Sequence, residues 1–342
     1  MPSPSLLQRL KERKLVQWAF SLGALFFFII VMANHRGCST TLPEDSRWVR
    51  ETTSIQKQVE VDGVRLRVLD TGEGPPVLLL HGFLDSSYTW RKLIPLLQGH
   101  YRVIALDLPG FGYSDKPEEP FPFADYASVV LGVLDQLEID RPFIVGNSMG
   151  GSVALRIAID FPDRVRGLVP IDPGTPRDEG EPFGPMNLLR MRFVGDFCVH
   201  VMGPWTFERV WNSMLTEGRR VSEIEMDEMY GLLNTPGARR AALNQIREIR
   251  TNPVGWEATE KISAPTLLIW GRQDELVPLR YGERLNDHIP NSRLVILDDT
   301  GHLPQWETPD EVTRLVDAFV EGVLAGAWDS SRSRGGPDPK TD

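Results

Sequence analysis

The feature that most limits how this chain can fold is a series of short, uninterrupted apolar runs that alternate with helical patterns. The runs occupy six stretches of the sequence, residues 76–82, 102–107, 142–147, 167–172, 266–271 and 294–299. Segments with helical spacing of apolar residues lie between them, for example 126–138 and 152–165. Strands that are apolar throughout are typical of a parallel sheet covered on both faces, and strand–helix alternation builds right-handed βαβ units. The chain is therefore predicted to be an α/β protein with a mostly parallel, doubly wound sheet.

This predicted core is divided by one long interruption. Residues 175–262 are mostly helical in pattern and lie between two core strands, so they are interpreted as an inserted helical cap. The core then comprises residues 56–174 and 263–326, and it opens with a hairpin in VEVDGVRLRVLD (59–70) around an Asp-Gly turn. Residues 327–342 are predicted to be a disordered tail, because their composition is too polar to form a core.

An uncharged stretch of 19 residues, 15–33, precedes the core. A helix of this length can cross a hydrocarbon layer about 30 Å thick. Residues 1–14 before it are basic, so the positive-inside bias predicts a single-pass anchor with the body on the non-cytoplasmic side. Residues 34–55 are then a polar tether. Two alternatives stay open: cleavage of a signal peptide at Ala33, and lipid attachment at Cys38.

The formal net charge of −10 is unevenly distributed along the chain. The first 38 residues hold five Lys or Arg and one acidic residue, so the remainder holds 32 basic and 46 acidic residues. An acidic body argues against a nucleic-acid partner, whose phosphates require a basic surface. Cys38 and Cys198 are too few for a disulfide framework, and no Cys/His cluster has the spacing of metal ligands. We therefore expect neither a metal nor a cofactor.

The octapeptide IVGNSMGG (144–151) places a serine between two glycines, directly after an apolar run and before a helical pattern. In a strand–turn–helix setting, G-x-S-x-G is typical of a nucleophile elbow, a turn so sharp that Gly146 and Gly150 are needed on either side. The helix N-terminus behind the turn adds backbone N–H groups and the positive end of a dipole. Ser148 is therefore the candidate nucleophile. The alternative is a serine in an ordinary tight turn.

A serine hydroxyl becomes a strong nucleophile only when a base removes its proton. Of the six histidines, His302 stands out, because DDTGHLPQWETP lies just beyond the last predicted strand. A catalytic histidine needs a carboxylate that fixes its tautomer. Asp274, in WGRQDELVP after the strand TLLIWG, fills this role in the chain order Ser–Asp–His. Asp172, at the end of GLVPID, is the alternative partner.

The tripeptide HGF (81–83) follows another predicted strand and is interpreted as an oxyanion loop. Here the backbone N–H groups of Phe83 and Met149 would hold the negative oxygen that develops during acyl transfer. His81 is assigned a structural role in this loop rather than that of a second base.

At this point the sequence resembles the α/β-hydrolase superfamily, and within it the HGF-containing branch with a helical cap. The resemblance extends from about Gln58 to Ala325 and rests on five motifs in order: HGF (81–83), DLPGFGYSDKP (107–117), GNSMGG (146–151), GRQDELVP (271–278) and GH (301–302). It implies hydrolysis through an acyl-enzyme, in which Ser148 attacks, His302 shuttles the proton and water releases the acid. Dehalogenase and epoxide-hydrolase relatives carry an aspartate at the nucleophile position, so the serine here argues against those activities.

Within this match, DLPGFGYSDKP looks like the turn that follows the fourth core strand of the family. Its glycines allow a tight backbone, and we interpret it as a structural element. Asp107 and Ser114 are expected to brace the oxyanion loop.

The cap is expected to determine the substrate. Residues 193–215 are rich in Phe, Trp, Val and Met, which pack on the core, line an apolar acyl pocket or lie on a bilayer. A membrane-anchored esterase acting on a small-molecule ester or a monoacylglycerol-like lipid is the favoured function. Perhydrolysis, carbon–carbon bond hydrolysis or acyl transfer with the same triad, and a non-catalytic binding module, are the alternatives. The oligomeric state stays open.

Overall fold

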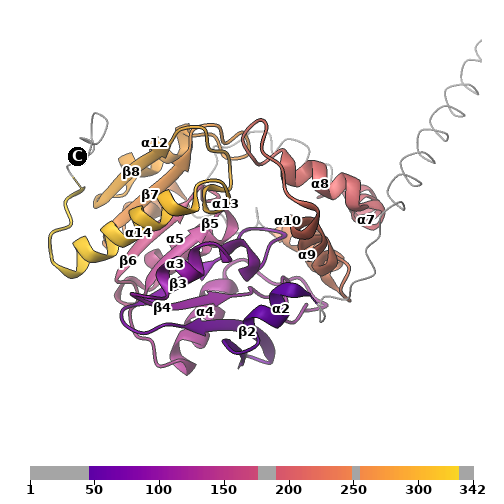
Figure 1. Cartoon of the computed structure of the whole chain (residues 1–342), viewed down its shortest axis with the longest axis horizontal. Helices are drawn as coiled ribbons and strands as arrows, with labels where there is room; N and C mark the ends of the chain where they lie inside the picture. Colours follow the sequence, from indigo (N-terminus) through magenta and orange to yellow (C-terminus); the bar gives the residue numbers. More distant parts are fainter. Residues whose placement is uncertain (1–45, 176–189, 249–254, 331–342) are drawn as a thin grey trace, which may run out of the picture.

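The computed structural model of the chain describes residues 46–175, 190–248 and 255–330. Its centre is one eight-stranded sheet with the strand order β1-β2-β4-β3-β5-β6-β7-β8 (Figure 1). The strands are β1 (Gln56–Val61), β2 (Val64–Thr71), β3 (Pro76–Leu80), β4 (Arg102–Leu106), β5 (Phe143–Asn147), β6 (Gly167–Ile171), β7 (Thr266–Gly271) and β8 (Ser292–Leu297). β2 pairs antiparallel with both β1 and β4, and every other pair is parallel. The predicted mostly parallel sheet is confirmed.

Helices cover both faces of this sheet (Figure 1). The core helices and 3-10 turns are α2 (Arg47–Thr52), η2 (Ser87–Trp90), α3 (Leu93–Leu97), α4 (Asp125–Gln136), α5 (Met149–Asp160), η3 (Pro162–Arg164), α11 (Trp256–Thr259), α12 (Arg280–His288), α13 (Pro304–Glu307) and α14 (Pro309–Leu324). Successive strand residues point to opposite faces. One set packs with α4, α5 and α12, and the other packs with α3 and α14. The apolar strands are therefore explained by two cores, one on each face.

The helix expected over 152–165 is shorter and begins earlier, because α5 ends at Asp160. Phe161 precedes Pro162, and the residue before a proline is disfavoured in helical backbone. The chain continues there as the 3-10 turn η3.

The cap lies between β6 and β7 and contains α7 (Arg192–Val201), α8 (Pro204–Asn212), α9 (Glu223–Leu233) and α10 (Ala238–Glu248). Its C-terminal boundary differs from the predicted 262. The Trp256 ring of α11 stacks on Tyr281 of α12 with centroids 6.4 Å apart, and Ile262 is fully buried in the core. Residues 255–262 therefore belong to the core, because their apolar side chains pack beside the sheet.

The end of the predicted tether, residues 46–55, is also part of the folded body. Ser46 caps α2 by accepting a hydrogen bond from the N–H of Val49, and Trp48 is only 7% exposed. The Trp48 ring packs edge-to-face on Tyr88, with centroids 5.6 Å apart. In the otherwise polar sequence RWVRET, the buried Trp48 side chain therefore attaches α2 to the folded body.

The predicted tail starts later than residue 327. Trp328 packs edge-to-face on Phe319 of α14, and its indole N–H donates to Asn291 Oδ1 at 3.0 Å. The predicted basic segment and anchor, residues 1–33, lie outside the described residues. Within the part that is described, no helix is both long enough and apolar enough to cross a bilayer.

Candidate active site

Ser148 occupies the turn between β5 and α5, as the sequence predicts. Its backbone has φ 50° and ψ −116°, a region that non-glycine residues rarely adopt. A Cβ at Gly146 would lie 2.4 Å from the Gly150 carbonyl oxygen, and a Cβ at Gly150 would lie 2.2 Å from the Leu80 oxygen. The two glycines are therefore required by the tightness of the turn, which strains Ser148 and lifts it above the end of the sheet.

The HGF loop lies directly against this turn. A Cβ at Gly82 would come within 3.3 Å of the Ser148 Cβ. Among the described residues, neither the N–H of Phe83 nor that of Met149 donates a hydrogen bond. Two unused donors beside the serine are what an oxyanion hole requires.

His81 has a structural position in the same loop. Its ring is fully buried, its Nδ1 lies 2.7 Å from the Gly82 oxygen, and its Nε2 accepts from the Leu108 N–H at 3.0 Å. Burial lowers the pKa of His81, which keeps the ring neutral and able to accept that bond. Both ring nitrogens of His81 are engaged with backbone atoms, so neither is available to act as a base for Ser148.

Asp274 and His302 are brought together from the loops that follow β7 and β8. His302 Nδ1 lies 2.6 Å from Asp274 Oδ2, and both side chains are buried. The other carboxylate oxygen accepts the N–H groups of Leu276 and Val277 at 2.8 and 2.9 Å. The Nε2 atom of His302 is buried and has no hydrogen-bond partner among the described residues. A carboxylate on Nδ1 and an unpaired Nε2 are the arrangement that a general base needs.

The backbone of His302 is held by hydrogen bonds on two sides. The side-chain amide of Asn147, the residue before Ser148, donates to the His302 carbonyl at 3.1 Å. The His302 N–H donates to the carbonyl of Met214, in the cap, at 2.8 Å. Sequence analysis did not identify either contact. Asn147 could have been suspected from its place beside the nucleophile, whereas nothing in the sequence indicates Met214.

Glu307 makes a second connection between the histidine loop and the cap. One of its carboxylate oxygens accepts the N–H of Gly301 at 2.8 Å, and the other accepts the N–H of Thr216 at 2.9 Å. Arg219 donates to the Glu307 carbonyl at 2.7 Å. A buried carboxylate with two N–H donors is a strong, directional link. The residue before the candidate base is thus fixed to the cap.

Asp172 is also in the site, although it was only the alternative partner for His302. Oxygen atoms of Asp172 and Asp274 and a ring nitrogen of His302 all lie within 4.8 Å of one another. Burial and the neighbouring Asp274 raise the pKa of Asp172 well above its usual value. The raised pKa favours the neutral, protonated form of Asp172.

This trio is the one group of metal-ligand type found among the described residues. A metal requires its ligands to be deprotonated. The raised pKa of Asp172 opposes cation binding, and Asp274 is already bonded to His302 and to two N–H groups, so the trio suits proton transfer better.

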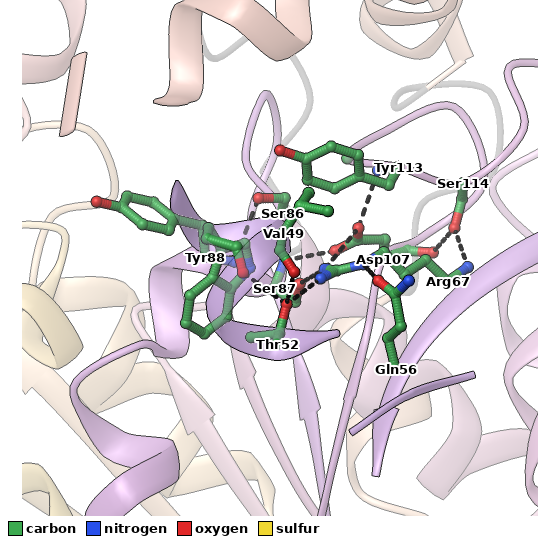
Figure 2. A network of polar contacts seen from close by, with 12 residues as sticks. Val49, Thr52, Gln56, Arg67, Ser86, Ser87, Tyr88, Asp107, Tyr113 and Ser114 are labelled. Atoms are coloured by element: carbon green, nitrogen blue, oxygen red, sulfur yellow. Dashed lines mark hydrogen bonds and ion pairs between the residues drawn. The ribbon is translucent and has the colours of Figure 1, made fainter. Parts of the chain in front are cut away.

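A buried polar network lies beside the segment that follows HGF (Figure 2). Its centre is Arg67 of β2, which is 1% exposed and lies 3.7 Å from the Asp107 carboxylate. Arg67 also donates to Ser87 Oγ at 3.0 Å, to Gln56 and to Thr52 of α2. Asp107 accepts the Ser87 N–H at 2.6 Å. The network thus joins α2 and β2 to the segment that follows HGF.

The 107–117 turn closes this network. The Ser114 hydroxyl donates to the Asp107 carbonyl at 2.5 Å and accepts the Arg67 N–H at 2.9 Å. The second Asp107 oxygen accepts the Tyr113 N–H at 2.9 Å. Asp107 thus holds Ser87, four residues after HGF, and Ser114 holds Asp107 and Arg67; that these two residues brace the HGF loop itself stays a prediction.

We expect Arg67→Met to lower the free energy of unfolding by about 3–5 kcal/mol, because it leaves the buried Asp107 charge without its cation. Denaturant unfolding of the purified full chain measures this loss. Arg65→Met is the matched control two residues away, since the ion pair of Arg65 with Asp115 is exposed, and it should change stability little. Equal losses in the two variants would contradict a structural role for the buried pair.

A buried acid, Asp85, follows the HGF loop by two residues. One of its oxygens accepts the Ser86 N–H at 2.8 Å, and the other has no partner among the described residues. Burial is the main cause that raises the pKa of Asp85 to about 7; Asp107 adds to the rise and Arg91 opposes it. Between the unfolded value of 3.8 and about 7, the folded chain keeps a proton that the unfolded chain releases.

Stability should therefore fall as pH rises from about 4 to about 7, and Asp85→Asn should remove this loss. We expect the variant to exceed the parent protein by roughly 4 kcal/mol at pH 8 and by little at pH 4. Denaturant unfolding at a series of pH values measures the difference. A stability gap that does not change with pH would contradict the raised pKa.

The sheet topology, the inserted cap and the serine elbow together define a hydrolase of the α/β-hydrolase type. The chain belongs to the alpha/beta hydrolase fold family, whose model matches residues 75–309. It is 34% identical over 284 residues to a 2-hydroxy-6-oxononadienedioate/2-hydroxy-6-oxononatrienedioate hydrolase of Burkholderia vietnamiensis. That match covers 78% of this chain and 96% of the relative.

Two solved structures are similar over nearly their whole length. The meta-cleavage product hydrolase CumD of Pseudomonas fluorescens is 28% identical with a TM-score of 0.69, over 79% of this chain and 98% of that one. Est816, described as an N-acyl homoserine lactone degrading enzyme, is 29% identical with a TM-score of 0.64. That match covers 77% of this chain and all of Est816. Two of these three relatives are named as hydrolases and Est816 as a lactone-degrading enzyme, so their named activities differ.

Proposed function

We propose that this protein is a membrane-anchored serine hydrolase that cleaves carboxylic esters through an acyl-enzyme. The observation that carries the proposal is the strained Ser148, whose neighbour Asn147 donates to the His302 carbonyl, together with the pair Asp274–His302, in which only His302 Nε2 is without a partner among the described residues. A nucleophile, a base and an orienting carboxylate are the three groups that acyl transfer requires.

In the proposed reaction the Ser148 hydroxyl oxygen attacks the ester carbonyl while His302 Nε2 takes the hydroxyl proton. The N–H groups of Phe83 and Met149 stabilise the oxyanion. Collapse breaks the bond to the alkoxy group, which leaves as an alcohol with the proton from His302. Water then attacks the acyl-enzyme with His302 again as the base, and the acid and free Ser148 result. Asp274 stabilises the imidazolium in both steps.

Carbon–carbon bond hydrolysis is the second candidate, and the relatives named as oxononadienedioate and meta-cleavage product hydrolases favour it. A dioate substrate carries two carboxylates, which arginine or lysine usually binds. Carbon–carbon bond hydrolysis of a dioate therefore requires, besides the triad, a basic side chain placed for these carboxylates, whereas a neutral ester requires only the triad and the oxyanion donors.

The membrane location is supported by the uncharged stretch 15–33 and the basic residues before it. An anchor of this orientation holds the catalytic body close to the non-cytoplasmic face of the bilayer. Lipid-like esters such as monoacylglycerols would then be concentrated near the site. A small ester remains within the same proposal, with the anchor setting location alone.

We expect the full chain to hydrolyse p-nitrophenyl esters with a kcat/KM at least about 100-fold above that for a 2-hydroxy-6-oxo-dienedioate. Acyl chains from acetate to dodecanoate are compared under the same detergent conditions, and diketo-acid cleavage is followed by absorbance. A long-chain optimum would favour a lipid substrate, and a short-chain optimum a small ester.

The reverse preference, with rapid diketo-acid cleavage and little ester hydrolysis, would overturn the ester proposal in favour of the second candidate. Hydrolysis of neither class by a folded protein would contradict both.

A further inference from the structure

The outer face of the cap exposes an unusual number of apolar side chains. Ten large apolar side chains are exposed in the described part of the chain, and five of them lie within residues 191–210. These five, called the cap face below, are Met191, Phe193, Phe197, Trp205 and Val210, with exposures of 55%, 86%, 49%, 48% and 41%. Clustered exposed apolar side chains mark an interaction surface, whereas single ones are ordinary.

The cap face is distinct from the side of the cap helices that packs against the rest of the protein. The core side of α8 is fully packed by Phe207 and Trp211, which are 0% and 1% exposed. Phe207 contacts Tyr230 of α9, and Trp211 contacts Trp306 of α13. The cap helices have therefore already buried one apolar side and carry a second one outward.

The arrangement on these helices is typical of an interfacial surface. Phe193 and Phe197 are four residues apart on α7, so they lie on one side of it. On α8 the Arg209 guanidinium lies 5.1 Å from the centre of the Trp205 ring. Tryptophan is enriched where hydrocarbon meets water, and arginine reaches from there toward the polar headgroups.

The chain also enters the described structure on this side of the molecule. The N–H of Trp48, in the first helix α2, donates to Glu228 of α9 in the cap at 3.2 Å. In Figure 1, α2 lies on the same side as the cap helices, and the end of α14 lies on the opposite side. Only residues 34–45 separate α2 from the proposed anchor. Twelve extended residues span at most about 40 Å, so the bilayer is within reach of the cap.

We propose that the cap face rests on the lipid bilayer into which residues 15–33 insert, with Phe193, Phe197 and Trp205 among the acyl chains. This inference rests on the anchored location in the proposed function, and it adds an orientation of the body. Tethering makes the contact intramolecular, so a modest apolar area is enough to hold it. The cap then faces the source of a lipid-like substrate.

The test uses the full chain in phosphatidylcholine vesicles, with Cys38→Ser and Cys198→Ser to remove the native thiols. A single cysteine is introduced by Phe193→Cys and carries an environment-sensitive fluorophore. Leu324→Cys is the matched control, since Leu324 is 46% exposed at the end of α14. We expect vesicles with brominated acyl chains to reduce the fluorescence at 193 by about twofold or more and to leave 324 unchanged.

An unquenched label at 193 in vesicle-bound protein would overturn the proposal. A blue-shifted but unquenched label would also overturn it, because a protein surface would then cover the face. Equal quenching at 193 and 324 would mean adsorption without orientation, which contradicts it as well. A chain that does not float with the vesicles would refute both the anchor and the contact.

A second readout separates the contact from the chemistry. Phe193→Ser combined with Phe197→Ser should raise KM for a vesicle-borne ester about tenfold and leave kcat/KM for soluble p-nitrophenyl acetate unchanged. Leu324→Ser is the control. If no ester is hydrolysed, the proposed chemistry fails while quenching still decides the contact. If ester hydrolysis is normal and quenching is absent, the contact alone fails.

Discussion

Ser148→Ala should lower kcat for ester hydrolysis by about 10⁴-fold or more and leave KM nearly unchanged. The substitution removes the attacking oxygen but keeps the elbow, since alanine can occupy the Ser148 backbone no worse than serine does. Steady-state hydrolysis of p-nitrophenyl esters by the parent protein and the variant measures the loss. The remaining rate reflects the oxyanion donors at Phe83 and Met149, which act without the nucleophile.

The control for this substitution is Ser213→Ala, because the Ser213 hydroxyl donates only to the Val210 carbonyl in the cap. It should retain the parent rate. A fluorophosphonate probe should add its mass to the parent protein and to Ser213→Ala, but not to Ser148→Ala. Ester hydrolysis that survives Ser148→Ala, or labelling at another serine, would remove Ser148 from the mechanism.

Asp274→Asn should lower kcat by about 10³–10⁴-fold, whereas Asp172→Asn should lower it by less than about tenfold. In Asp274→Asn the amide oxygen takes the place of Oδ1, which accepts the Leu276 and Val277 N–H groups, so the NH₂ group faces His302 Nδ1 and favours the wrong tautomer of the ring. Burial and Asp274 raise the pKa of Asp172, which favours its neutral form, so a neutral amide of the same shape changes little. The two variants measured side by side by ester hydrolysis therefore separate two buried carboxyls that share one site.

The two aspartate variants also have opposite expected outcomes under the alternative assignment. If Asp172 were the partner of His302, Asp172→Asn would show the larger loss. Equal losses would mean that the two carboxyls share one negative charge. Unfolding measurements on both variants distinguish a damaged fold from a damaged proton path.

Much of the fold follows from the sequence because its strands are buried on both faces. A strand with two covered faces must be apolar at every residue, and this makes β3 to β7 visible as short runs. The serine elbow and Asp274 were found for a related reason. Parallel strands end at one edge of the sheet, so polar residues just after them converge.

The features that were missed depend on contacts between distant parts of the chain. The tether boundary was misplaced because a single tryptophan, Trp48, packs the otherwise polar helix α2 against the body. One apolar residue hardly changes the average composition of such a segment, so composition did not reveal it. The raised pKa of Asp172 depends on burial and on a carboxyl 102 positions away in the chain, neither of which the local sequence contains. The hydrogen bond from the His302 N–H to Met214 is accepted by a backbone carbonyl, which every residue has, so no sequence pattern indicates it.

The links between the histidine loop and the cap limit how this protein can open. His302 and Glu307 both bind backbone of residues 214–216, so that end of the cap moves only together with the general base. If the whole cap moved as a rigid body to admit substrate, it would pull His302 away from Asp274 and Ser148 at each opening. Opening is instead expected to pivot near residue 214, with α7 moving most and His302 staying in place. The resting enzyme would then be assembled before substrate arrives, and gating rather than assembly of the triad would limit turnover of bulky substrates.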